Sequence, residues 1–157
     1  MPDQVLTPKG ARIGLQDDIG FLVSIARSIF VRRANEALEL DGIRVRSYSL
    51  LAMAADSGGI TQSEAAGVLR LNPSQVVALV DELEGRGLVE RRAHPTDRRA
   101  RVIAATDAGR RLCDVAGGRL ADALDVALQG LADSERTALH DLLQKLIRSA
   151  DEADVRG

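Results

Sequence analysis

The sequence has few of the residues from which metal, redox and aromatic ligand sites are built. It contains one cysteine, Cys113, no tryptophan, and only 2% aromatic residues among its 157 residues. One cysteine cannot form an intrachain disulfide, and the chain lacks the clustered cysteine and histidine of a zinc site. We therefore expect no metal framework and no stacking pocket for a large aromatic ligand.

Signals for membrane insertion, secretion and catalysis are also missing. No apolar run approaches the ~20 residues of a membrane span, and residues 1–10 lack a basic segment that leads into an apolar one. The chain has no glycine-rich phosphate loop, and only His94 and His140 are available as histidine bases. We expect a cytoplasmic protein that is not an enzyme, makes no membrane contact and uses no cofactor.

Charge is distributed unevenly along the chain. The formal net charge is -2, which predicts no general attraction to phosphate. Between Arg86 and Arg111, however, eight arginines oppose three acidic residues, so this stretch carries +5 and the remainder -7. A molecule polarised in this way can present one cationic face to a phosphate backbone. A solvated arginine-rich loop is the alternative.

Apolar residues at helical spacing predict six helices. Their approximate ranges are 19–38, 47–55, 61–69, 73–85, 107–128 and 134–147. Thr61 and Glu64 have the spacing of a capping box, and Asn72 followed by Pro73 forms a second helix start. A glycine pair at 117–118 interrupts the fifth pattern and predicts a bend or a close helix crossing.

The third and fourth predicted helices are joined by a tight turn, as in a helix-turn-helix unit whose second helix enters the major groove. Residues 88–92 and 100–105 have the pattern of strands, and the polar segment 94–99 between them is predicted to be a hairpin loop. A helix-turn-helix followed at once by an arginine-rich hairpin is the order of elements in a winged helix that binds DNA.

The chain resembles the MarR (multiple-antibiotic-resistance regulator) family of bacterial winged-helix transcription factors over nearly its whole length. The segments that carry the resemblance are 61–66, 83–91, 94–99 and 105–109. The resemblance implies a mainly α fold with a small β wing, in which long N- and C-terminal helices intertwine as the dimerisation domain of a homodimer. The apolar stripes on the terminal helices agree, because a lone winged helix would leave them uncovered.

On this basis the chain divides into three parts. These are an N-terminal arm with the first dimerisation helix (1–45), a winged helix-turn-helix DNA-binding lobe (46–106) and C-terminal dimerisation helices (107–157). The family implies a sequence-specific transcriptional regulator, commonly a repressor. A twofold dimer places its reading helices about one DNA turn, ~34 Å, apart, so the expected target is a near-palindromic operator in double-stranded DNA.

The family's pattern assigns DNA contacts to the two helices of this unit. The expected contacts are Asn72, Ser74, Gln75, Val77 and Ala78 on the bases, and Thr61, Gln62 and Ser63 on phosphates. Gln75 has the donor and acceptor that pair with adenine, and Val77 can touch a thymine methyl group. First-turn solvation is the alternative for Ser74 and Gln75.

The predicted hairpin loop supplies the remaining DNA contacts. Arg99 occupies the position at which the family's Asp-x-Arg motif places an arginine in the minor groove, where narrow A/T-rich segments concentrate negative potential. Asp97 is expected to orient Arg99 through a salt bridge. Arg98 is expected on a phosphate, and Arg101 either on a phosphate or exposed to water.

The reading helix departs from the family's pattern at three positions. Pro73, Ala78 and Glu82 stand where relatives often carry lysine or arginine. Each neutralised phosphate adds about 0.9 to the log-log salt slope, so we expect a shallow salt dependence and an affinity that depends on the wing. Glu82 is expected to face phosphates unfavourably.

Family members often respond to small aromatic or phenolic compounds or to oxidants, so a small phenolic or carboxylate effector is an expected partner. The family's cleft nominates Phe21, Ile25, Ile29, Arg46, Tyr48, Met53 and Cys113. Core packing is the alternative for most of them. Arg46 and Tyr48 are the better candidates, because a cation and a phenol can hold a carboxylate or hydroxyl.

Cys113 has two interpretations. Beside Leu112 and Val115 on the fifth helix, it is predicted to be a small buried hydrophobe. The alternative is a redox sensor, since Arg110 and Arg111 would lower the pKa of an exposed thiol.

Two other classes of function remain open. One is a protein-interaction module in which the winged lobe docks a protein, and the other is a nonspecific architectural DNA-binding protein with the same fold. Salt-sensitive DNA binding that is lost in an Arg99 variant distinguishes a regulator from the first. Preference for one sequence over bulk DNA distinguishes it from the second.

Overall fold

The computed structural model describes residues 14–56, 58–94, 96–97 and 100–156. It is mainly helical with one two-stranded antiparallel sheet, which confirms the expected fold class. The elements are α1 (Ile19–Ala37), α2 (Val45–Ala55), α3 (Gln62–Leu69), α4 (Pro73–Gly85), β1 (Val89–Ala93), β2 (Arg101–Ala105), α5 (Asp107–Ala127) and α6 (Asp133–Arg156), with short 3-10 turns η1 (Leu15–Asp17) and η2 (Glu39–Asp41).

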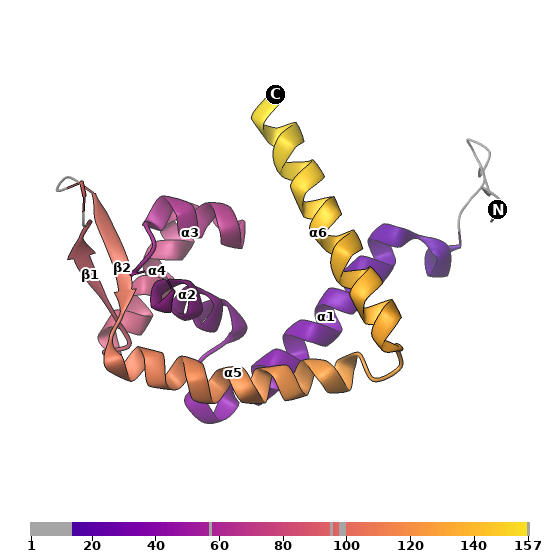
Figure 1. Cartoon of the computed structure of the whole chain (residues 1–157), viewed down its shortest axis with the longest axis horizontal. Helices are drawn as coiled ribbons and strands as arrows, with labels where there is room; N and C mark the ends of the chain where they lie inside the picture. Colours follow the sequence, from indigo (N-terminus) through magenta and orange to yellow (C-terminus); the bar gives the residue numbers. More distant parts are fainter. Residues whose placement is uncertain (1–13, 57, 95, 98–99, 157) are drawn as a thin grey trace.

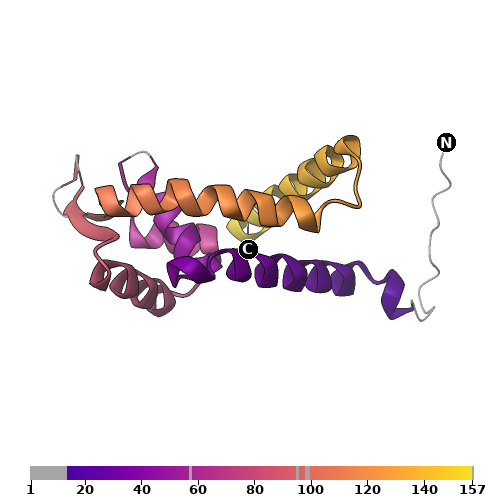
Figure 2. The same ribbon diagram turned by 90° about the horizontal axis from the view of Figure 1, so that it is seen from below.

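The molecule has two parts that α5 joins (Figure 1). At one end, α2, α3, α4 and the hairpin of β1 and β2 form a lobe, and at the other end α1 and α6 project away from it. Helix α5 runs from the hairpin to the start of α6, and α1 packs against it. Seen from below, α1 and α5 extend from the lobe in the same direction (Figure 2).

The core of the lobe lies where α2, α4 and β2 meet. Helix α4 buries Val76, Val80 and Leu83, which recur at offsets of four and three residues, so its opposite face is free. Strand β2 is buried at four of its five positions and pairs with β1 from Val89 opposite Ala105 onward. The sheet and α2 therefore hold one side of α4 and leave its other side to solvent.

Two helix starts differ from the sequence prediction because their caps come from unexpected residues. Helix α2 begins at Val45 rather than near Ser47, since the side-chain oxygen of Asn35 in α1 accepts a hydrogen bond from the Val45 backbone N–H at 2.9 Å. Helix α6 already includes Asp133. Its first turn is closed by Glu135, which accepts from the backbone N–H of Ala132 at 2.8 Å.

Helix α5 continues through the glycine pair at 117–118, so the pair does not end the helix. It does mark a close helix crossing, because a Cβ at position 117 would lie 2.9 Å from the hydroxyl of Tyr48 in α2. Near the start of α5, Gly109 is buried against Leu88 and Leu51. These two glycines let α5 lie close to the lobe.

Helices α1 and α6 carry apolar side chains that the described part of the chain leaves exposed. The exposed fraction reaches 77% at Ile19 in α1 and 66% at Leu142 in α6. The same faces continue with Leu22, Ile25 and Ile29 on α1 and with Leu143, Leu146 and Ile147 on α6. Contiguous exposed apolar residues of this kind mark an interaction surface.

Candidate nucleic-acid interface

The N-terminus of α3 is closed by the predicted capping box. The Thr61 hydroxyl oxygen accepts from the backbone N–H of Glu64 at 3.2 Å, while the Glu64 carboxylate accepts from the Thr61 hydroxyl at 2.7 Å and from its backbone N–H at 2.8 Å. The hydrogen bond from the hydroxyl is the main reason that the pKa of Glu64 is lowered. Gln62 and Ser63 stay exposed in the first turn. They, rather than Thr61, have free donors for a phosphate.

The N-terminus of α4 is closed in the same way, with Asn72 as N-cap and Pro73 in the first turn. The Asn72 side-chain oxygen accepts from the Gln75 backbone N–H at 3.0 Å and from the Ser74 hydroxyl at 2.6 Å. In return, the Gln75 side-chain oxygen accepts from the Asn72 backbone N–H at 3.1 Å. Two of the side chains expected to contact bases therefore also hold the end of the helix.

The outward face of α4 carries no basic residue and includes exposed Val77 and Ala78. Glu82 makes a contact that the sequence did not predict, because both of its carboxylate oxygens lie 3.2 Å from the hydroxyl of Ser47 and accept from it. Glu82 is nevertheless exposed, so the expectation that it faces phosphates stays a prediction. Ser47 is 1% exposed, so Glu82 supplies the partner that this buried hydroxyl needs. No local sequence pattern signals a contact between residues so far apart in the chain.

A second contact that sequence reasoning missed fixes the hairpin to α4. Arg91 of β1 donates to Asp81 at 2.5 Å and also pairs with Glu84. The hydrogen bond to Asp81 is the largest cause of the raised pKa of Arg91. Two carboxylates on the last turns of a helix, followed by an arginine in the next strand, are the sequence signal that would have identified this contact.

Arg101 and Gln62, both expected to contact DNA, lie on one cavity. It measures about 350 Å³, and its other lining residues are Arg91, Val102 and Ile103. Arg101 is exposed, and its side chain makes no hydrogen bond or ion pair with any residue that the structure describes. This position of Arg101, beside the first turn of α3, agrees with both roles expected for it, a phosphate contact and exposure to water.

The turn between the strands is organised by His94. Its ring Nδ1 accepts from the backbone N–H groups of Thr96 at 3.3 Å and Asp97 at 3.2 Å. The histidine considered as a base therefore has a local structural contact. Arg98 and Arg99 lie outside the described residues, so the ion pair expected between Asp97 and Arg99 stays a prediction.

Four of the six described arginines in the +5 stretch bind other residues of the chain. Arg86 donates to the backbone oxygens of Asp41 and Gly42, Arg91 to the two carboxylates of α4, Arg92 to Glu90, and Arg110 to the backbone oxygen of Ala55. Among the described arginines of this stretch, only Arg101 and Arg111 have no such bond. Fewer guanidinium groups are thus free for direct phosphate contacts than the sequence count implies.

The residues nominated for an effector cleft come from three helices, α1, α2 and α5. Tyr48, Met53 and Cys113 pack against the core of the lobe, whereas Phe21, Ile25 and Ile29 follow α1, and Arg46 is exposed on α2. The cavity beside Met53, about 470 Å³, is lined by Asp56, Gly59, Ile60, Glu64 and Val68 and by no residue of α1. That these residues form one cleft stays a prediction.

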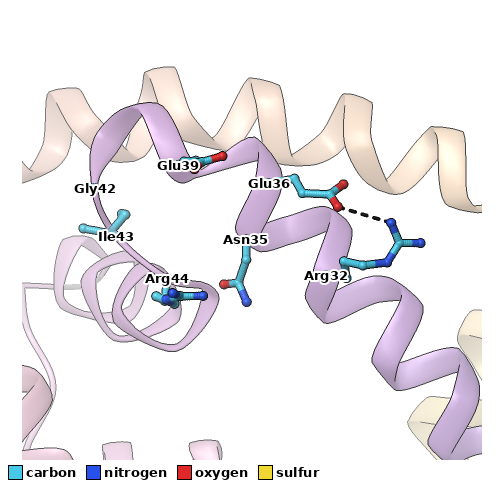
Figure 3. Close-up of a pocket in the computed structure, with 7 residues that line it drawn as sticks. All are labelled: Arg32, Asn35, Glu36, Glu39, Gly42, Ile43 and Arg44. Carbon is cyan, nitrogen blue, oxygen red and sulfur yellow. Dashed lines mark hydrogen bonds and ion pairs between the residues drawn. The ribbon is translucent and has the colours of Figure 1, made fainter.

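A further cavity of about 450 Å³ lies at the corner between α1 and α2 (Figure 3). It is lined by Arg32, Asn35, Glu36, Glu39, Gly42, Ile43 and Arg44, none of which was nominated from the sequence. Arg32 and Glu36 form an ion pair at 3.2 Å on its rim. Two arginines and two glutamates leave this cavity without a dominant charge.

We expect the Cys113 thiol to react slowly with iodoacetamide in the folded protein and faster in urea. Burial, and then the charge of Asp114, raise its pKa from the ordinary 9.0, and Arg110 offsets this only in part. The thiolate is the reactive form, so a raised pKa protects the thiol. Because the unfolded thiol loses its proton first, the free energy of unfolding should fall as pH rises above about 9.

Labelling followed by mass spectrometry at pH 8.5 measures the two rates. Equal rates in folded and unfolded protein would contradict this prediction. A faster rate in the folded protein would favour the redox interpretation, which requires the opposite pKa shift.

Two absences concern the described residues alone. None of their helices combines the length and the apolar character needed to cross a bilayer. Within the same residues, no group of three or more histidine, cysteine, aspartate or glutamate side chains is placed to hold a metal ion.

Comparison with known proteins gives a consistent result. The family model of the MarR family matches residues 43–100. The structure of CouR from Rhodococcus jostii RHA1 bound to p-coumaroyl-CoA is 44% identical, covers 86% of this chain and 95% of that one, and superposes with a TM-score of 0.81.

Two further structures carry the family's name. A transcriptional regulator of the MarR family from Rhodococcus sp. RHA1 is 43% identical, covers 86% of this chain and 97% of that one, and has a TM-score of 0.80. A cysteine-to-serine mutant of MarR from E. coli complexed with operator DNA is 25% identical, with coverage of 82% and 92% and a TM-score of 0.74. Given these similarities along nearly its whole length, this chain belongs to the MarR family of transcriptional regulators.

Proposed function

We propose that two copies of this chain form a homodimer that represses transcription by binding a near-palindromic operator. The observation that carries the proposal is the grouping, on one lobe, of the exposed first turns of α3 and α4 with Arg101 of β2. The E. coli relative complexed with operator DNA supports DNA as the partner. In this proposal residues 46–106 form the DNA-binding lobe, and residues 1–45 and 107–157 form the dimerisation region.

The base contacts come from α4. Exposed Val77 and Ala78 offer methyl groups to thymine. The capping box occupies one lone pair of the Gln75 side-chain oxygen, so its amide N–H groups are the part left fully available to a base. Asn72 and Ser74 contribute what their mutual hydrogen bond leaves free.

The phosphate contacts come from α3 and the hairpin. Gln62 and Ser63 lie at a helix N-terminus, where backbone N–H groups and the helix dipole favour an anion. Arg101 borders the same cavity as Gln62 and can share a phosphate with it. By the family resemblance, Arg98 contacts the backbone and Arg99 enters the minor groove.

The apolar faces of α1 and α6 form the dimer interface in this proposal. A twofold axis brings the same patch of each protomer against its copy, so one apolar stripe on each terminal helix is enough to build an interface. Because the target is genomic DNA, the protein acts in the cytoplasm, and the proposal assigns it no catalysis.

We also propose a phenolic acyl-CoA thioester as the effector. CouR, at 44% identity, has been crystallised with p-coumaroyl-CoA, and a phenolic ligand agrees with the compound class expected from the sequence. The test is release of fluorescent operator DNA by p-coumaroyl-CoA, with p-coumarate and free CoA as controls. If neither the thioester nor its parts release the DNA, this effector class is wrong while the DNA-binding proposal stands.

The proposal is tested first by selecting bound sequences from a random duplex pool at near-physiological salt. A near-palindrome with half-sites one turn apart is the expected product. Enrichment of no sequence over bulk DNA would overturn it and favour the architectural protein. Absence of any DNA binding would favour the protein-interaction module.

Replacement of Arg99 is expected to weaken operator binding by about 1–3 kcal/mol, or roughly 5- to 150-fold. An arginine in the minor groove interacts with a concentrated negative potential, and no other residue of the hairpin takes its place there. Fluorescence anisotropy on Arg99→Ala measures the loss. Arg148→Ala is the control, since Arg148 is exposed on α6 outside the proposed DNA face. Equal losses in both variants would contradict the assignment.

A further inference from the structure

The corner between α1 and α2 is held by arginines from two other helices. The chain leaves α1 at Ala37, turns through η2, and enters α2 at Val45. Gly42 has a φ of 61°, a left-handed conformation that favours glycine and turns the chain sharply. Figure 3 shows the cavity that borders this corner, with Glu39 and Gly42 among its lining residues.

The first arginine comes from the reading helix. Arg86, the C-cap of α4, donates one guanidinium nitrogen to the backbone oxygen of Gly42 at 2.9 Å and another to that of Asp41 at 2.6 Å. Two parallel bonds from one planar group fix direction as well as distance. The end of α4 is therefore tied to the corner.

The second arginine comes from the middle of α5. Arg119 pairs with the carboxylate of Asp41 and donates to the backbone oxygen of Ala37 at 3.4 Å. The Asp41 side chain is only 12% exposed, so this pair is better shielded from water than the ion pair of Arg32 with Glu36, whose side chains are more than half exposed.

Asp41 is the one residue bound by both arginines. Its backbone oxygen binds Arg86 at the end of α4 and its carboxylate binds Arg119 of α5, while Asp41 itself lies in η2, the turn that follows α1. We call the group formed by Asp41, Arg86 and Arg119 the Asp41 joint. It connects the reading helix to both α1 and α5, which belong to the dimerisation region of the proposed function.

A small rotation of α4 at the Asp41 joint would displace the opposite end of the helix by several ångströms. Helix α4 has 13 residues and is therefore about 20 Å long. The joint holds its C-terminal end, whereas the first turn at the other end contacts bases. A rotation of roughly 10° at the joint would move that first turn by about 3 Å, close to the ~3.4 Å separation of neighbouring base pairs.

We propose that Asp41 is a positioning residue for DNA recognition, which sets the separation of the two reading helices and so the half-site spacing that the dimer accepts. Asp41 does not touch DNA and acts through Arg86 and Arg119. The inference rests on the proposed function, because a spacing exists only for a dimer that reads two half-sites.

The test uses the selected operator and duplexes in which its half-sites are moved by one or two base pairs in either direction. Anisotropy gives the dissociation constant for each duplex and for a single half-site. The preference for the selected spacing is the ratio of the dissociation constant on a shifted duplex to that on the selected operator. We expect this ratio to fall about tenfold in Asp41→Ala and in Arg119→Ala, a change typical of coupled sites. The dissociation constant for the single half-site should stay within about twofold of the wild-type value, since each lobe is intact.

Three further variants test whether the effect belongs to the ion pair between Asp41 and Arg119. The double variant should lose no more of this preference than either single variant, because each single substitution already breaks the ion pair between Asp41 and Arg119. Arg32→Ala, which breaks an exposed ion pair on α1, should keep the wild-type preference. If Asp41→Ala does not fold, Asp41→Asn removes the charge at nearly constant size and is measured in the same way.

The possible outcomes distinguish failure of the role proposed for Asp41 from failure of the proposed function. A sharply preferred spacing in the wild type that the variants retain overturns the inference alone. An equal weakening on all duplexes, the single half-site included, also overturns it, because that is the effect of lost stability. A wild type that prefers no spacing overturns the proposed function itself.

Discussion

Gly109→Ala is expected to destabilise the protein by about 3 kcal/mol or more, out of the 5–15 kcal/mol typical of a folded domain. A Cβ at position 109 would overlap the backbone oxygen of Leu88 and approach the Cδ1 atom of Leu51 to 3.0 Å. Neither neighbour can give way easily, since the Leu88 oxygen accepts from the Thr106 backbone N–H at 3.0 Å and Leu51 is fully buried. Protein interiors are close-packed, so the first turn of α5 must move away from the lobe.

Urea denaturation at fixed protein concentration measures this change. The matched control is Gly118→Ala on the same helix, where a Cβ would meet nothing within 4 Å. That variant should gain up to about 1 kcal/mol from helix propensity. Opposite signs for the same substitution on one helix would establish close approach as the reason for Gly109. Two variants of equal stability would contradict it.

Leu146→Asp is expected to dissociate the proposed dimer, with a dimer dissociation constant raised about 100-fold or more, equivalent to about 2.7 kcal/mol. Leu146 is 59% exposed in one protomer and lies on the apolar face of α6. In a dimer through this face the new carboxylate would be buried without a partner, which costs several kcal/mol. The twofold axis repeats the substitution in the other protomer.

Sedimentation equilibrium gives the dissociation constant, and anisotropy gives the associated loss of operator binding. Gln144→Asp is the matched control, because it introduces the same charge two residues away, on the opposite face of α6. It should remain dimeric. Dissociation of both variants to the same extent, or of neither, would rule out this face of α6 as the interface.

Local signals account for the parts of the fold that the sequence predicted well. Thr61 with Glu64 and Asn72 with Pro73 lie within a single turn of chain, and both helix starts are confirmed. The apolar spacing of α4 and the strand patterns that flank the hairpin are equally local. The family resemblance then supplied the functional meaning of these elements, which periodicity alone does not give.

Contacts between distant residues account for what was missed. The start of α2 depends on Asn35 in the preceding helix, and the buried hydroxyl of Ser47 meets Glu82 across the lobe. The charge count overstates the number of free arginines for a related reason. Formal charge does not reveal that Arg86 and Arg110 bind backbone oxygens inside the chain instead of facing a phosphate.

Those backbone contacts have a consequence for how the protein responds to acidity. Arg86, Arg110 and Arg119 all donate to carbonyl oxygens near the ends of helices. A guanidinium group keeps its proton in proteins, and a peptide carbonyl does not titrate at all. The links among α1, α2, α4 and α5 that use these guanidinium–carbonyl pairs should therefore keep their strength as the pH falls.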